Sequence, residues 1–177
     1  HRLPEPKVRA FAVQCLGQMG DSELRQYMLQ LIQALKFETF HDSALARFLL
    51  RRALSNPSLI GHIFFWYLKA EMHVPVVQER FGILLELYLR NCGKHRISLG
   101  HQMLVMRKLG EIAEDVIQQP SKAERLERLR AGIRKIELPS TFRLPLNPDR
   151  TCSYLSIMQS IDRLTANHGI DQMVRAL

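Results

Sequence analysis

The sequence predicts an all-α protein in which stacked antiparallel helix pairs form a right-handed superhelix of the HEAT or armadillo type. Apolar residues recur with a helical period along most of the chain, and short connections rich in Pro, Gly, Ser or Asn separate the periodic segments. No segment before residue 140 alternates as a half-buried strand would. Pairing consecutive helices gives a period of about 35 to 40 residues, close to that of these repeats. A closed helical bundle is the alternative that the pattern leaves open.

The first two expected helices are separated by glycines. The first follows Pro6 and ends at Gly17 and Gly20, and the segment DSE at 21–23 supplies capping residues for the second. Both show the i, i+3, i+4, i+7 spacing of a helix with one buried face. The apolar residues are Val8, Phe11, Ala12, Cys15, Leu16 and Met19 in the first helix and Leu24, Tyr27, Met28, Leu31, Ile32 and Leu35 in the second.

Five more helices are expected before residue 137. The third is stopped by SNP at 55–57, the fourth by Pro75 and the fifth by NCG at 91–93. The seventh begins at a capping box, Ser121 followed by Glu124, and its charges form a solvated face. The third to sixth helices cover about 43–54, 61–75, 76–89 and 97–118. Prolines then make residues 137–150 an extended connector, and CSYLSIM at 152–158 is compatible with a strand or a short helix.

The fourth helix contains GHIFFWYLKAEMHVP, and apolar side chains cover more than half of its circumference. Such a helix is expected to lie centrally in a stack, with a narrow polar edge left partly exposed. The expected edge is His62, Trp66, Lys69 and His73. The expected core of the protein includes Phe11, Leu31, Phe48, Ile63, Phe64, Phe65, Tyr67 and Phe81.

Composition indicates a soluble globular protein of about one domain, and the start of the chain suggests a fragment of a longer one. Cys15, Cys92 and Cys152 are isolated, which favours free buried thiols in a reducing, cytoplasmic setting. No apolar run approaches the roughly 20 residues that cross a bilayer, and no secretory signal is evident. The net charge of +8 favours an acidic partner without identifying it.

No catalytic, cofactor-binding or metal-binding residue is predicted. His62 has Trp66 at i+4 where a second ligand would be needed, so metal binding is not supported. The sequence has no Gly-rich phosphate loop, no DFG and no GxSxG, and Asp149 and Asp162 stand alone. Nucleic-acid binding rests on the high pI alone, because the aromatic residues are not interleaved with basic ones.

A basic stretch follows the fifth helix, since no acidic residue lies between Leu87 and Gly110. The simplest interpretation is a solvated surface. The functional interpretation is a patch that faces an acidic neighbouring domain or an anionic lipid leaflet. The cations that we single out for this role are Arg90, Lys94 and Arg96.

Several long segments resemble, in order and spacing, the helical accessory (PIK) domain of phosphatidylinositol 3-kinase catalytic subunits, most closely class I. The longest is IGHIFFWYLKAEMHVPVVQERFGILLELY at 60–88. The others are PEPKVRAFAVQCL at 4–16, YMLQLIQALKFE at 27–38, SALARFLLRRALSNPSLIGH at 43–62 and FRLPLNP at 142–148. The resemblance is strong over residues 4–119 and thinner over 120–150, and it is more specific than any short motif in the chain.

The resemblance implies that residues 1–119 are the carboxy-terminal part of an accessory domain. Residues 120–150 would be its last helix and the connector toward a kinase amino-terminal lobe. Residues 151–177 lack the lobe's phosphate-loop serine and its PLW-like segment, so they are a divergent or truncated lobe start, or a different ending.

In function, the resemblance implies a non-catalytic scaffold within a cytoplasmic lipid kinase that is recruited to membranes. The parent chain would phosphorylate phosphoinositides with ATP and Mg²⁺. The implied partners are the other domains of that chain, a regulatory subunit and an anionic membrane surface. The alternative from a different class is a stand-alone helical-repeat adaptor that binds a protein partner.

Overall fold

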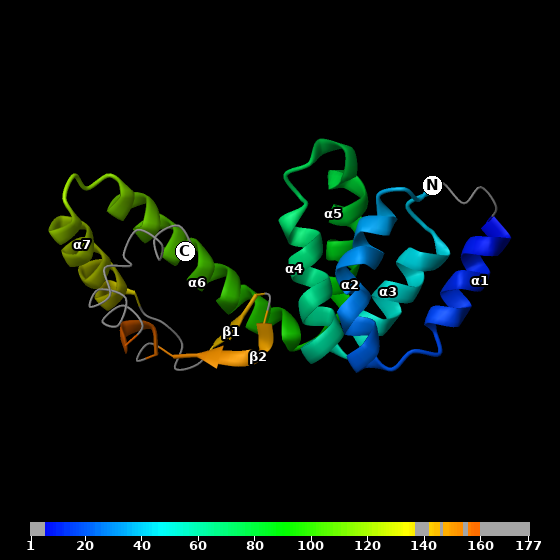
Figure 1. Ribbon diagram of the computed structural model, residues 1–177. Helices are drawn as coiled ribbons and strands as arrows, with labels where there is room; N and C mark the ends of the chain where they lie inside the picture. The colour runs from blue at the N-terminus through cyan, green and yellow to red at the C-terminus, as the bar shows by residue number, and fades with distance from the viewer. Residues whose placement is uncertain (1–5, 137–141, 146, 154–155, 160–177) are drawn as a thin grey trace. The chain divides into compact units, whose positions relative to one another are not determined.

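The computed structural model describes residues 6–136, 142–145, 147–153 and 156–159. The chain divides into two compact units, His1–Arg96 and Ile97–Leu177. Its regular structure is almost entirely helical, which confirms the all-α prediction (Figure 1). Most of the predicted ending at 151–177, namely residues 154–155 and 160–177, lies outside the described residues.

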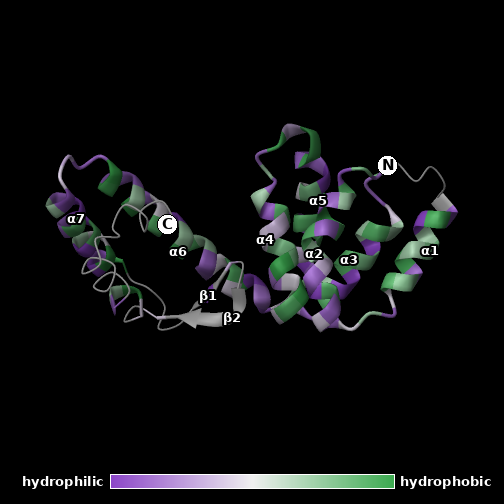
Figure 2. Cartoon of the chain, in the orientation of Figure 1, coloured by the Kyte–Doolittle hydropathy of each residue, from purple (hydrophilic) through white to green (hydrophobic). Residues whose placement is uncertain are grey.

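The first unit is a two-layered stack of helices. One layer contains α1, α3 and α5, because α1 packs on α3 and α3 packs on α5, and the other contains α2 and α4. The layers are joined where α2 meets α3 and where α4 meets α5. Hydrophilic and hydrophobic residues alternate along these helices, as expected for helices with a buried side (Figure 2). The helices are α1 (Pro6–Leu16), α2 (Asp21–Leu35), α3 (Ala44–Ser55), α4 (His62–Ala70) and α5 (Pro75–Asn91).

Local sequence explains where these helices begin. The Ser43 hydroxyl accepts a hydrogen bond from the Ala46 N–H at 3.1 Å and caps α3. Pro75 begins α5, where its missing N–H is not needed. The fourth helix is shorter than predicted, since it ends at Ala70 and a single π-helical turn, η1 (Pro57–Gly61), precedes it. The side chain of Asn56 caps this turn by accepting from the Leu59 N–H.

The core of the first unit lies between the layers. Of the residues predicted there, Phe48, Ile63, Phe64, Phe65 and Phe81 are buried. Leu31 and Tyr67 are only half-buried, and Leu31 lies at the flank of the buried stripe of α2.

The prediction for Phe11 is wrong, since this side chain is 66% exposed. Helix α1 instead turns Arg9, Val13 and Leu16 inward, so the face that packs is rotated from the predicted one. Cys15 on the same helix is also exposed, which contradicts its prediction as a buried thiol.

The second unit contains α6 (His95–Ile117), most of which lies beyond Arg96, and α7 (Lys122–Lys135). The predicted capping box is present, because Ser121 accepts from the Glu124 N–H and Glu124 accepts from the Ser121 N–H. Val116, Leu129 and Ile133 are buried together and form a small core. The connector contains an antiparallel hairpin of β1 (Phe142–Leu144) and β2 (Asn147–Cys152), with Phe142 opposite Cys152.

Candidate functional site

The polar edge predicted on α4 is not a continuous surface. His62 is fully buried and Trp66 is 9% exposed, while Lys69 and His73 are exposed. The prediction of a partly exposed edge is therefore wrong for the first two residues. The reason is that α4 packs against α2, α3 and α5, so more of its circumference is covered than periodicity suggested.

His62 instead belongs to a buried polar cluster that the sequence did not predict. Its ring lies 6.2 Å from that of His95, and His95 Nδ1 lies 2.8 Å from the hydroxyl oxygen of the fully buried Tyr88. Gly61 provides the room for this hydroxyl, because a Cβ at position 61 would lie 2.0 Å from Tyr88 Oη. A glycine next to His62 is the one sequence signal that could have pointed to this close approach.

Neither Tyr88 nor Cys92, the two weakly acidic side chains near His62, is activated as a nucleophile. Burial, followed by the proximity of Cys92, raises the pKa of Tyr88. Burial also raises the pKa of Cys92. Both groups therefore remain protonated at neutral pH, and the cluster is suited to packing and hydrogen bonding rather than to covalent catalysis.

Charged side chains tie the helices of the first unit together. Asp21 accepts from the Asn56 side chain at 2.9 Å and from Arg52 Nε at 3.0 Å, and these hydrogen bonds lower its pKa. Glu71 accepts from Lys36 at 2.9 Å and from Gln33 at 2.6 Å, which lowers its pKa in the same way. Each network joins residues more than 30 positions apart in the sequence.

Arg80 on α5 makes a further link that periodicity could not reveal. Its guanidinium donates to the carbonyl oxygens of Leu35 and Glu38, the latter at 2.6 Å. Leu35 is the last residue of α2 and Glu38 lies just beyond it, and the Leu35 carbonyl also accepts from the Glu38 N–H at 3.2 Å. Arg80 therefore fixes the first turns of α5 to the end of α2.

The basic residues singled out after the fifth helix are exposed. Arg90 lies in the last turn of α5, Lys94 in the turn that follows, and Arg96 in the first turn of α6. Arg90 pairs with Glu86 at 2.6 Å across one helical turn, and both side chains are well exposed. Such a pair contributes little to stability, so these cations remain available to a partner.

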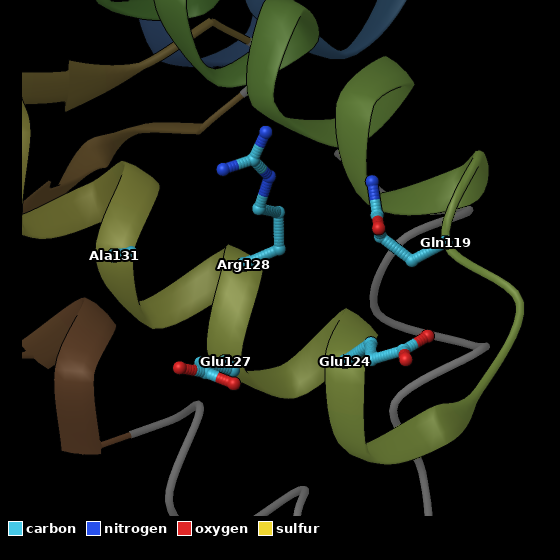
Figure 3. Close-up of a pocket in the computed structure, with 5 residues that line it drawn as sticks. All are labelled: Gln119, Glu124, Glu127, Arg128 and Ala131. Carbon is cyan, nitrogen blue, oxygen red and sulfur yellow. The ribbon is translucent and has the colours of Figure 1, made fainter.

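A shallow hollow beside α7 has no evident chemistry. It is lined by Gln119, Glu124, Glu127, Arg128 and Ala131, and the two carboxylates point away from the guanidinium (Figure 3). Arg128 Nε pairs with Asp115 at 3.0 Å, and Glu124 is engaged in the capping box. The polar groups of this hollow therefore stabilise α6 and α7.

Within residues 6–136 and the shorter described segments, no three His, Cys, Asp or Glu side chains are placed to hold a metal ion together. None of the helices that the structure describes has the length and apolar character needed to span a membrane.

The polar residues of the first unit mainly join one helix to another, which is the organisation of a helical scaffold domain. Comparison with known proteins identifies the family to which this domain belongs. The profile of the phosphoinositide 3-kinase family accessory domain (PIK domain) matches residues 2–100. The chain belongs to this family.

Two curated relatives from Dictyostelium discoideum support the assignment. Phosphatidylinositol 3-kinase 2 is 46% identical over 147 residues, which is 83% of this chain and 8% of the relative. Phosphatidylinositol 3-kinase 1 is 50% identical over 143 residues, which is 80% of this chain and 9% of the relative. The chain thus spans less than a tenth of the length of either relative.

Proposed function

We propose that this chain is the scaffold segment of a phosphatidylinositol 3-kinase, on which the other domains of the parent chain pack. The observation that carries the proposal is the agreement of two independent boundaries. The accessory-domain profile matches residues 2–100, and the first compact unit is His1–Arg96. The part that resembles the family thus coincides closely with one compact unit of the structure, which supports the proposal.

The physical basis of this role is stiffness. Helices in two layers are held to one another by buried aromatic side chains and by the Asp21–Arg52 and Lys36–Glu71 pairs. Each helix fixes the next, so surfaces at the two ends keep a constant separation. We propose that the layers continue as a right-handed superhelix in the parent chain.

We extend this proposal to the parent protein. It would be a cytoplasmic kinase, closest to class I, that phosphorylates phosphoinositides with ATP and Mg²⁺ and is recruited to membranes. Residues 1–119 would be the accessory domain, and 120–150 would lead to the kinase lobe. The proposed contact surface for another domain, a regulatory subunit or an anionic membrane contains Lys69, His73, Arg90, Lys94 and Arg96, which are exposed.

A lipid kinase assay on the full-length gene product tests the proposal. We expect phosphate transfer from ATP to phosphatidylinositol lipids that requires Mg²⁺. A full-length product without a kinase domain, or without this activity when correctly folded, contradicts the proposal and favours the stand-alone adaptor.

The basic patch has a separate test. Changing Arg90, Lys94 and Arg96 to Glu replaces three exposed cations with anions. Reduced association of the full-length kinase with anionic liposomes is expected. Unchanged association rules out the membrane role of these residues and leaves the interdomain role.

A further inference from the structure

We infer that the end of the first unit opposite the Arg90–Arg96 patch is a second lipid-facing surface, formed by Phe37, Phe40 and Val76. We call these three residues the tip surface. Their side chains are 66%, 73% and 92% exposed, respectively. Burial of a Phe or Val side chain is favourable, so leaving all three in water forgoes that contribution. Two such residues on one connection and a third in the adjacent first turn of α5 indicate a partner.

The tip surface comes from two connections that lie at the same end of the unit. Phe37 and Phe40 are in the α2–α3 connection, and Val76 is in the first turn of α5, next to the α4–α5 connection (Figure 1). Arg80 donates to the Glu38 carbonyl, and Lys36 pairs with Glu71 at 2.9 Å. These bonds hold the two connections together, so the apolar side chains are presented from a fixed base.

The charges around the tip surface suit an anionic lipid headgroup layer. Three carboxylates at this end are engaged by cations within the unit, in the pairs Arg9–Glu38, Lys36–Glu71 and Arg47–Asp42. Lys7 and Lys69 are exposed. Among the described charged residues of these connections and the adjoining helix turns, six are basic and four are acidic, and four of the basic ones are bonded within the unit: Lys7, Arg9, Lys36, Arg47, Lys69 and Arg80 against Glu38, Asp42, Glu71 and Glu79. Exposed apolar side chains surrounded by basic residues are typical of protein surfaces that contact the membrane interface.

A lipid layer fits this geometry better than a protein partner does. Phe37 and Phe40 protrude from a connection and Val76 from the first turn of a helix, whereas protein interfaces bury a broad continuous area around a packed centre. The preference for lipid also rests on the proposed function, because the substrate of the proposed parent kinase is embedded in a membrane. Phe37 and Phe40 would insert at the headgroup level while the lysines remain among the phosphates.

Vesicle co-sedimentation of the 177-residue chain tests the tip surface. Binding is expected to vesicles of phosphatidylcholine with phosphatidylserine, and to be weaker with phosphatidylcholine alone or at high salt. The double variant Phe37→Ser with Phe40→Ser should bind at least about tenfold more weakly, because it loses the inserted aromatic area. Circular dichroism and thermal unfolding establish that the variant is folded, which its exposed positions favour.

Phe11→Ser is the matched control, since Phe11 has the same side chain and the same 66% exposure as Phe37 but lies on α1. Its binding should equal that of the unchanged chain. An equal loss in the control, or unchanged binding in the folded double variant, overturns the tip surface. So does stronger protection of residues 36–43 from hydrogen exchange in the full-length protein without vesicles than in the 177-residue chain, because another domain then covers them. None of these results depends on kinase activity, which the proposed function alone requires.

Discussion

Gly61 has no room for a side chain, because it lies against the hydroxyl of Tyr88 and the carbonyl of Ala53. A Cβ built at this position would lie 2.0 Å from Tyr88 Oη and 2.7 Å from the Ala53 oxygen. Tyr88 is fully buried and the other neighbour is backbone, so neither can move easily. Gly61→Ala is therefore expected to lower the free energy of unfolding by about 1–3 kcal/mol or more, measured by urea denaturation.

Two companion variants separate this clash from the ordinary effect of alanine. Gly100 lies within α6 with nothing near its missing Cβ, so Gly100→Ala should be neutral or stabilise by about 0.5–1 kcal/mol. Tyr88→Phe removes the clashing hydroxyl, so it should reduce the cost of Gly61→Ala in a double-mutant cycle. Simple additivity of the two changes would contradict the proposed clash.

Asp21 gives the stability of the first unit an acid dependence. Hydrogen bonds from Asn56 and Arg52 lower its pKa in the folded state, so the unfolded state binds the proton more tightly. Its stabilising contribution is present above its ordinary pKa of about 3.9 and is lost as the pH falls toward the folded-state value. In urea titrations, Asp21→Asn should be less stable at neutral pH and should lose less stability on acidification.

Asp42→Asn is the control for this pH dependence. Asp42 also has a lowered pKa, caused by Arg47, but its side chain is 69% exposed. Solvent screening makes such a pair contribute little, so the acid dependence of this variant should match that of the unchanged chain. If Asp42→Asn changed the acid dependence of stability more than Asp21→Asn does, the Asp21 network would not be the main source of that dependence.

His62 shows where sequence reasoning failed at this scale. Its angular position opposite the apolar face predicted exposure, and its removal would then cost little. The structure buries it completely beside His95 and Tyr88, so His62→Ala is now expected to leave a buried cavity. Periodicity identifies a helix's most apolar face, but it cannot tell how many neighbours surround a helix as central as α4.

Among the helices, the junction of α2 and α5 depends on one side chain. Arg80 donates to the Leu35 carbonyl, which also accepts from the Glu38 N–H, and to the Glu38 carbonyl just beyond α2. Arg80→Met keeps much of the apolar stem and removes both bonds, so unfolding should become easier by about 1–3 kcal/mol. Arg90→Met removes an exposed pair with Glu86 and should change stability by less than about 1 kcal/mol. Equal effects of the two variants would contradict this assignment.

The helices themselves were predicted well because their ends carry local signals. Ser43 and the Ser121–Glu124 capping box mark starts that depend only on neighbouring residues. The π-helical turn before α4 and the inward face of α1 were missed, since both depend on tertiary packing. The exposure of Phe37 and Phe40 was missed for a related reason, because connections have no periodicity from which to read exposure.

For the whole molecule, the division at residues 96 and 97 predicts two regions of separate stability. Phe64 is fully buried in the first unit, and Leu129 is fully buried in the small core of the second. Replacing either with Ala should remove about 2–5 kcal/mol from its own unit. Because a compact unit can open without its neighbour, the loss should remain local.

Native-state hydrogen exchange on the full chain measures this division. Leu129→Ala should accelerate exchange in α7 and the second half of α6 while α2 to α5 keep their protection. Phe64→Ala should accelerate exchange in α2 to α5 and leave α7 unchanged. If either variant accelerates both regions equally, the chain unfolds as one cooperative body. The family match to residues 2–100 would then describe a sequence boundary without a corresponding boundary in stability.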